Sequence, residues 1–111
     1  MVRRQASSDV FSAIADPTRR VILQNLIAEA QPAGRLAGSV RMTQAAFSQH
    51  LRVLREAGLV TVSRAGRERI YSLDPTGLKT VSDWVAAFDR FWDQRLDRLA
   101  GFLRRKQAEK N

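Results

Sequence analysis

The chain has 111 residues, of which 44% are hydrophobic and 27% charged, proportions that favour one soluble globular domain over a disordered chain. Its apolar runs are short and its basic first residues are followed by polar ones, so we expect no membrane segment, no signal peptide and a cytoplasmic protein. The absence of cysteine excludes disulfides and thiolate metal sites, and the formal charge of +8 favours an anionic partner: nucleic acid, an anionic membrane or an acidic protein.

Three short helices are predicted before residue 41. Asp9 is a suitable N-cap for the first, and Asp16-Pro17 begins the second, because a proline in the first turn loses no hydrogen bond. Gln31-Pro32 should interrupt the chain, and a third helix should follow over residues 33–39. We expect the second helix to end near Ala30 and its inward face to consist of Val21, Ile22, Leu26 and Ile27.

Residues 43–57 are predicted to form one longer helix, which Thr43 caps and Gly58 ends in a left-handed conformation. At about 100° per residue, its apolar side chains fall on one side. The opposite side carries small polar side chains and an arginine, which suit a groove of DNA better than a protein core. The apolar side consists of Phe47, Leu51 and Leu54, and the outward side of Thr43, Gln44, Ala45, Ser48, Gln49 and Arg52.

The residue types on this outward side match contacts with base edges. Glutamine can pair with adenine, arginine with guanine, serine with a base or a phosphate, and an alanine can meet a thymine methyl group. Alternatives remain for each position: Thr43 is explained by capping alone, and Gln44, Ser48 and Gln49 by ordinary solvated surface. His50 projects toward the core side, where a packed or hydrogen-bonded histidine is favoured over a phosphate ligand.

Residues 60–73 alternate in polarity around Ala65-Gly66 and are predicted to form a two-stranded hairpin, or wing, after the long helix. Its arginines are Arg64, Arg67 and Arg69. Arg67, nearest the tip, is the first candidate for the minor groove, while Arg64 and Arg69 should meet phosphates or remain solvated.

A last helix is predicted over about residues 76–104, with apolar side chains in steps of three and four. These apolar side chains, several of them aromatic, form a stripe that is wide for so small a domain. We therefore interpret the stripe as a subunit interface; packing on its own domain is the alternative. Asp83, Asp89, Asp93 and Asp97 could suggest a cation site, but ion pairing with neighbouring arginines is favoured. The predicted dimer interface consists of Phe11, Val85, Phe88, Trp92, Leu96 and Leu99.

Together these segments resemble the ArsR/SmtB family of winged helix-turn-helix repressors. The resemblance covers about residues 9–75 and rests on residues 16–23, 47–60, 64–67 and 71–73. It implies a homodimer, joined by its first and last helices, that binds an imperfect palindrome in double-stranded DNA and represses its own operon. The best-known members sense metals through a cysteine pair or Asp/His/Glu clusters; this chain has no cysteine, its last predicted helix has no histidine and carries its acids among arginines, and its tail resembles a subgroup that does not sense metals. We therefore expect no metal or other cofactor.

The fold prediction is thus a mainly α protein with a small β-hairpin, a single winged helix-turn-helix domain over residues 1–111 that dimerises through its terminal helices. An enzyme is not expected, because the single histidine cannot address Ser48 from the same helix and no phosphate-binding loop is present. Two other functions stay open: an adaptor module acting through the aromatic tail, and architectural DNA binding without sequence preference. Nothing in the sequence names an operator or an effector.

Overall fold

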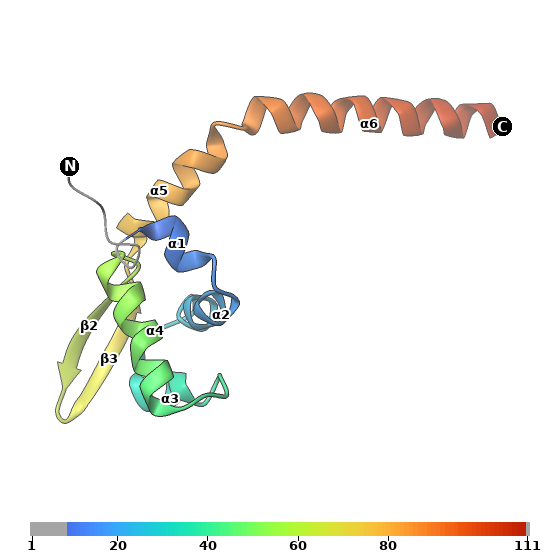
Figure 1. Ribbon diagram of the computed structural model, residues 1–111. Coiled ribbons are helices and arrows are strands. Elements are labelled where there is room, and N and C mark those ends of the chain that lie inside the picture. Colours follow the sequence, from blue (N-terminus) through green and yellow to red (C-terminus); the bar gives the residue numbers. More distant parts are fainter. Residues whose placement is uncertain (1–8, 111) are drawn as a thin grey trace. The chain divides into compact units, whose positions relative to one another are not determined.

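The protein is described here from a computed structural model that covers residues 9–110 (Figure 1). It is a winged helix-turn-helix fold of helices and one small antiparallel sheet, as predicted. The chain divides after Val81 into two compact units. The elements are α1 (Val10–Ile14), α2 (Pro17–Asn25), β1 (Gln31–Pro32), α3 (Ala33–Ala37), α4 (Gln44–Glu56), β2 (Val60–Ala65), β3 (Glu68–Leu73), α5 (Pro75–Ala86) and α6 (Asp89–Lys110).

The predicted helix caps are confirmed. Asp9 Oδ1 accepts a hydrogen bond from the N–H of Phe11 at 3.0 Å, and Asp16 Oδ1 accepts from Thr18 N–H at 2.8 Å. Thr43 Oγ1 accepts from Ala46 N–H at 3.1 Å. Each bond satisfies one of the backbone donors that a helix leaves unpaired at its start, which explains why these helices begin where the sequence predicts.

The second helix differs from its prediction at its end. It stops at Asn25, well before Ala30, because the N–H of the next residue, Leu26, bonds tightly to carbonyls two and three residues back. Ile27 therefore lies beyond the helix and is 72% exposed, and Val21 is 38% exposed, so both were wrongly placed on the inward face. The buried positions are Ile22, Leu23 and Leu26.

The sheet has three strands in the order β1-β3-β2, not the two predicted. β2 and β3 form the expected antiparallel hairpin, from Val60 opposite Leu73 to Ala65 opposite Glu68. The two residues left in the turn begin with Gly66 at φ +65°, the arrangement of a type II′ turn. β1 adds its two residues on the other edge of β3, with Gln31 opposite Tyr71.

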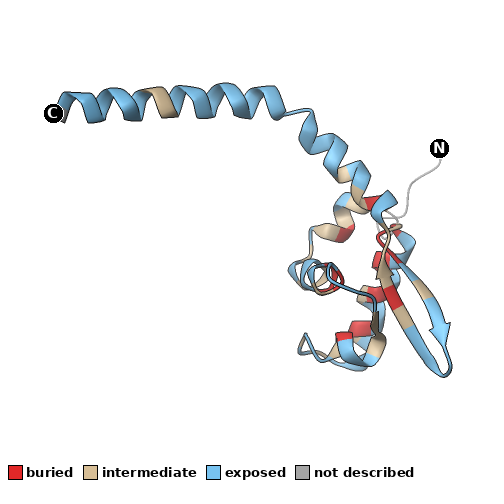
Figure 2. Cartoon of the chain, turned by 180° about the vertical axis from the view of Figure 1, so that it is seen from behind, coloured by how far each residue is buried: buried red, intermediate tan, exposed pale blue. Residues whose placement is uncertain are grey.

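The core lies in the first unit, where α4 packs against α1, α2 and β2. Figure 2 shows the buried residues gathered on these helices and on the inner ends of the hairpin strands. The inward face of α4 is as predicted, because Phe47, Leu51 and Leu54 are all buried. The largest fully buried side chains are Phe47, Ile22, Leu36, Leu54, Leu59 and Val60.

The segment predicted as one helix over residues 76–104 is two helices, and the single-helix prediction is wrong. Ala87 N–H bonds to Asp83 O at 3.3 Å and to Trp84 O at 3.2 Å, and Phe88 N–H reaches back only three residues, to Val85 O. This tightening ends α5, and α6 then begins with Phe88 O accepting from Trp92 N–H at 2.9 Å. Over the described residues, no helix is both long and apolar enough to span a bilayer.

Candidate nucleic-acid interface

The outward face of α4 carries the six predicted contact residues, and all six are exposed. Thr43 begins the helix, and Gln44 Nε2 donates to Ser48 Oγ at a long 3.4 Å one turn later. Gln49 and Arg52 make no side-chain hydrogen bond or ion pair to any described residue, so their head groups are available to a ligand. The opposite face of α4 carries buried side chains, which pack against the rest of the first unit and so fix the orientation of the outward face.

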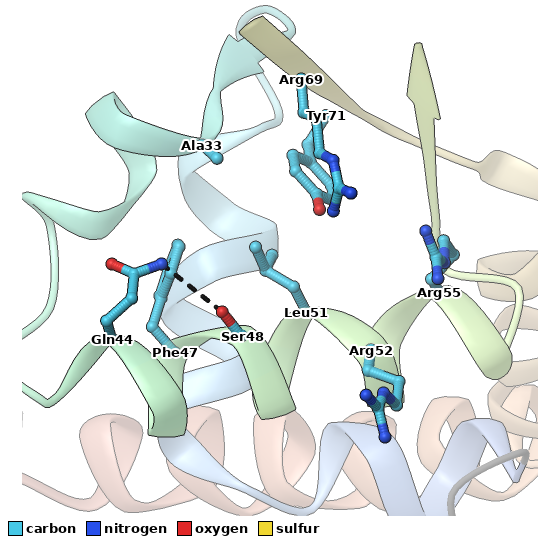
Figure 3. A pocket seen from close by; sticks show the side chains of 9 residues that line it. All are labelled: Ala33, Gln44, Phe47, Ser48, Leu51, Arg52, Arg55, Arg69 and Tyr71. Atoms are coloured by element: carbon cyan, nitrogen blue, oxygen red, sulfur yellow. Dashed lines mark hydrogen bonds between the residues drawn. The ribbon is translucent and has the colours of Figure 1, made fainter. Parts of the chain in front are cut away.

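A basic groove of about 260 Å³ runs between α4 and β3 (Figure 3). Arg52 and Arg55 come from α4, and Arg69 points from β3 toward that helix, beside Tyr71. No carboxylate lines the groove, so the three arginines of its lining have no neutralising partner there. Its lining consists of Ala33, Gln44, Phe47, Ser48, Leu51, Arg52, Arg55, Arg69 and Tyr71.

Arg55 was missed by sequence reasoning, which stopped at Arg52. The signal was present, because Arg55 follows Arg52 by three residues and therefore lies one turn further along nearly the same side. Its place in the groove depends also on β3, and this the helix pattern alone does not reveal.

The wing brings its three predicted arginines together. Arg64, Arg67 and Arg69 line a second cavity of about 320 Å³, together with Pro32, Ala33, Gly34 and Glu68. Arg64 and Arg69 lie directly opposite each other in the β2–β3 register. Like charges in this position destabilise a hairpin, and an anion bound between or beside them would relieve that repulsion. Arg69 lines both cavities and so connects the wing to the α4 groove.

His50 lies behind this surface in a network that joins three helices. Its Nδ1 is 3.1 Å from Arg19 Nη1, and Arg19 Nε donates to Ala13 O at 2.7 Å. Because a guanidinium can only donate, Nδ1 must accept, and the ring proton is then on Nε2. This contact agrees with the prediction that His50 is a hydrogen-bonded support for the recognition helix.

Asp16 completes the network from the start of α2. Burial raises the pKa of this carboxyl, but the backbone N–H groups of Arg19 and Thr18 donate to it. Together with the nearby charge of Arg19, they bring its pKa below the ordinary value. The ionised carboxylate is therefore the form that the folded protein stabilises.

Comparison with known proteins agrees with this geometry. The sequence matches the family described as a helix-turn-helix domain over residues 14–63. It is 42% identical over 93 residues to the HTH-type transcriptional regulator Rv2034 of Mycobacterium tuberculosis, a match that covers 84% of each chain. It is 36% identical over 81 residues to the transcriptional repressor SdpR of Bacillus subtilis, covering 73% of this chain and 90% of the repressor.

Solved structures with the same fold include an ArsR family transcriptional regulator, RHA00566, with a TM-score of 0.70 at 27% identity, covering 80% of this chain and 98% of that one. A possible transcriptional regulator for arsenical resistance is 46% identical with a TM-score of 0.65, covering 84% and 94%. The chain belongs to the ArsR/SmtB family. This ArsR/SmtB protein is thus a DNA-binding transcriptional regulator, as its sequence motifs implied.

The predicted dimer residues of this ArsR/SmtB regulator are exposed in the single chain, from 39% for Phe11 to 60% for Leu96. Aromatic side chains contact each other along the helices, with ring centroids 5.1 Å apart for Trp84–Phe88 and for Phe91–Trp92. Among the described residues, the predicted ion pairs are not seen for Asp89, Asp93 or Asp97. The Cζ atom of Arg95 instead lies 5.0 Å from the ring centroid of Phe91, over its face. Within residues 9–110, no three His, Asp or Glu side chains are grouped to hold a metal.

Proposed function

We propose that this regulator binds, as a homodimer, an imperfect palindrome in the promoter of its own operon and represses transcription there. The observation that carries the proposal is the basic groove between α4 and β3, which Arg52, Arg55 and Arg69 line and to which no carboxylate contributes. DNA phosphates are the ligands that such a space suits, because each guanidinium can donate two parallel hydrogen bonds to a phosphate.

We assign different DNA contacts to the outward face of α4 and to the wing. In helix-turn-helix proteins the second helix enters the major groove and its first turns meet the base edges. We assign base contacts to Gln44, Ala45, Ser48, Gln49 and Arg52, with Thr43 at the helix start. Arg67, in the turn of the wing, is assigned to the minor groove, whose width attracts arginine. Arg55, Arg64 and Arg69 are assigned to phosphates, which fix the register of the protein on the duplex.

A second copy is the partner that we assign to the exposed apolar side chains. Trp92, Leu96, Leu99 and Leu103 follow one another in steps of four, three and four, the spacing of a coiled-coil seam. Residues 89–97 carry three acids against two arginines, whereas residues 98–110 carry five cations against one acid. An antiparallel pair of α6 helices would therefore set the acidic half of each helix against the basic half of the other. The remaining predicted interface residues are Phe11, Val85 and Phe88.

A footprint of the purified protein on its own promoter tests the proposal. We expect protection of two half-sites about one helical turn apart, resistant to an excess of unrelated DNA. Equal competition by unrelated DNA would show architectural binding, and no protection with a stable dimer would favour an adaptor; either result overturns the proposal.

The dependence of affinity on salt tests the phosphate assignments separately. The logarithm of the binding constant should fall linearly with the logarithm of salt concentration, with a slope of about −0.9 for each phosphate contact. Replacing Arg55 by alanine should reduce that slope by about one contact and weaken binding to all sequences alike. An unchanged slope would remove Arg55 from the site.

A further inference from the structure

The first unit also contains an apolar cleft of about 250 Å³ that the DNA surface does not use. It lies among α1, α2, the end of β3 and the start of α5, and no residue of α4 contributes to it. Its lining consists of Ile14, Arg20, Leu23, Gln24, Ile27, Leu73 and Leu78.

The apolar side chains of this cleft are incompletely covered. Ile27, just past the end of α2, is 72% exposed, and Leu73 and Leu78 are only half-buried. Apolar side chains that remain in contact with water contribute no hydrophobic stabilisation. A ligand that covers them would bind favourably, because its binding removes this apolar surface from water. An apolar cavity of about 150 Å³ already holds a benzene-sized molecule, so this cleft has room for a short hydrocarbon.

One cation is fixed at the edge of the cleft. Arg20 Nη1 donates to Ile14 O at 2.7 Å and to Ala15 O at 3.2 Å, the carbonyls that end α1. These bonds hold the guanidinium in place while its Nε and Nη2 make no hydrogen bond to a described residue. No lining residue is acidic, and no described carboxylate lies within 4 Å of Arg20. An anionic head group is therefore the complement that the cleft lacks.

We propose that this cleft binds a small amphiphilic monocarboxylate. Its carboxylate would pair with Arg20, assisted by the Gln24 amide, and its hydrocarbon part would lie against Leu23, Leu73 and Leu78. A single fixed cation favours a monoanion over a phosphate or a dicarboxylate, and the apolar walls exclude a fully polar anion. The site shares no residue with the DNA surface, so the proposal does not depend on DNA binding.

Calorimetric titration of the full chain with butanoate, hexanoate and octanoate tests the site. Affinity should rise by roughly fourfold for each added methylene until the cleft is filled. Octylammonium, with the same chain and the opposite charge, should bind at least tenfold more weakly than octanoate. Equal binding of the two amphiphiles, or no dependence on chain length, would overturn the proposal.

Two substitutions locate the ligand. Arg20→Gln should weaken octanoate binding at least tenfold, whereas Arg35→Gln, which removes an exposed arginine outside the cleft, should not. Because Arg20 also holds the end of α1, Ile27→Asp provides a second test at a largely exposed position, where a new negative charge should repel the carboxylate without unfolding the domain. Unchanged octanoate binding in both variants would overturn the assignment. The assignment would also be overturned if the wild type binds no octanoate and Ile27→Asp abolishes self-association. These two results together would show that a second copy occupies the cleft.

Discussion

At the scale of single residues, Arg52 and Arg67 are the most direct test of the DNA surface. They lie on different elements, the recognition helix and the turn of the wing, and both are exposed. Replacing either by alanine should weaken specific binding by about 1–3 kcal/mol in a gel-shift titration, because Arg52 would lose a base contact in the major groove and Arg67 its contact in the minor groove. Arg35→Ala removes the same charge from an exposed residue that lines neither cavity of the DNA surface and is the matched control. If both variants bind like this control, the site is assigned to the wrong residues.

Asp16 makes a prediction about pH. Its pKa is lower in the folded protein than in the unfolded chain, so its ionisation adds stability above the unfolded pKa. That contribution is lost as the pH falls through the still lower folded pKa. Asp16→Asn keeps an N-cap oxygen but removes the charge, and should cost about 0.3–1 kcal/mol at neutral pH.

Urea denaturation of wild type and Asp16→Asn from pH 7 down to pH 3 checks this sign. The difference in unfolding free energy should shrink below about pH 4, where the Asp16 carboxylate takes up a proton in the unfolded chain while the lower pKa keeps it ionised in the folded protein. Asp16→Ala loses the cap oxygen as well as the charge. It should therefore remain about 1 kcal/mol less stable than Asp16→Asn over the whole pH range. A difference that grows toward acid pH would contradict the lowered pKa.

At the scale of elements, Gly77 brings the first turn of α5 close to the backbone of Gly58, just past the end of α4. A Cβ on this glycine would lie 2.2 Å from Gly58 O and 2.8 Å from Gly58 C, so the helix would have to move. We expect Gly77→Ala to lower the free energy of unfolding by about 1–3 kcal/mol. The Cβ would meet backbone atoms, which cannot move aside as the end of a flexible side chain can. The change is measured by chemical denaturation.

Gly34 gives the control for this substitution. Nothing lies within 4 Å of a Cβ built there, and the residue is in a helix, α3. Gly34→Ala should therefore be neutral or stabilising by up to about 1 kcal/mol. Equal stabilities of the two alanine variants would mean that α5 does not approach Gly58 as closely as described.

Elements specified by local chemistry were predictable from the sequence. α4 has a hydroxyl cap, an apolar face of regular period and a glycine stop, all within 16 residues, 43–58. β1 was missed because two residues, one of them proline, show no strand pattern, and their pairing with Tyr71 is a tertiary effect. The break between α5 and α6 was missed because Ala87 and Phe88 include no glycine or proline to signal it.

The same distinction holds for the candidate site. The outward face of α4 follows from helical period alone, so its six residues could be chosen from the sequence. The groove requires β3 beside α4, and neither Arg55 as a lining residue nor the Arg64–Arg69 register could be derived without the sheet. Likewise the packing of Gly77 against Gly58 depends on a close approach between segments distant in the sequence.

At the scale of the whole molecule, the prediction concerns self-association through α6. Trp92 lies in the second unit, is 51% exposed in the single chain and is not one of the buried core residues. If it anchors a homodimer, Trp92→Ala should weaken association by about 2 kcal/mol, roughly 30-fold in the dissociation constant. Sedimentation equilibrium measures that constant, and circular dichroism checks that α6 stays helical. Gln94→Ala, an exposed polar position near the opposite side of the helix, should change neither.

The proposed pair of DNA half-sites connects this prediction to the proposed repression. A dimer binds both half-sites as one ligand, so a variant that dissociates should need a much higher concentration for protection although each recognition helix is intact. Footprinting of Trp92→Ala should therefore show weakened protection of both half-sites together, and raising the protein concentration should restore it. A Trp92→Ala protein that stays dimeric and protects DNA like wild type would show that the second copy is held elsewhere, and the aromatic face of α6 would then belong to another partner.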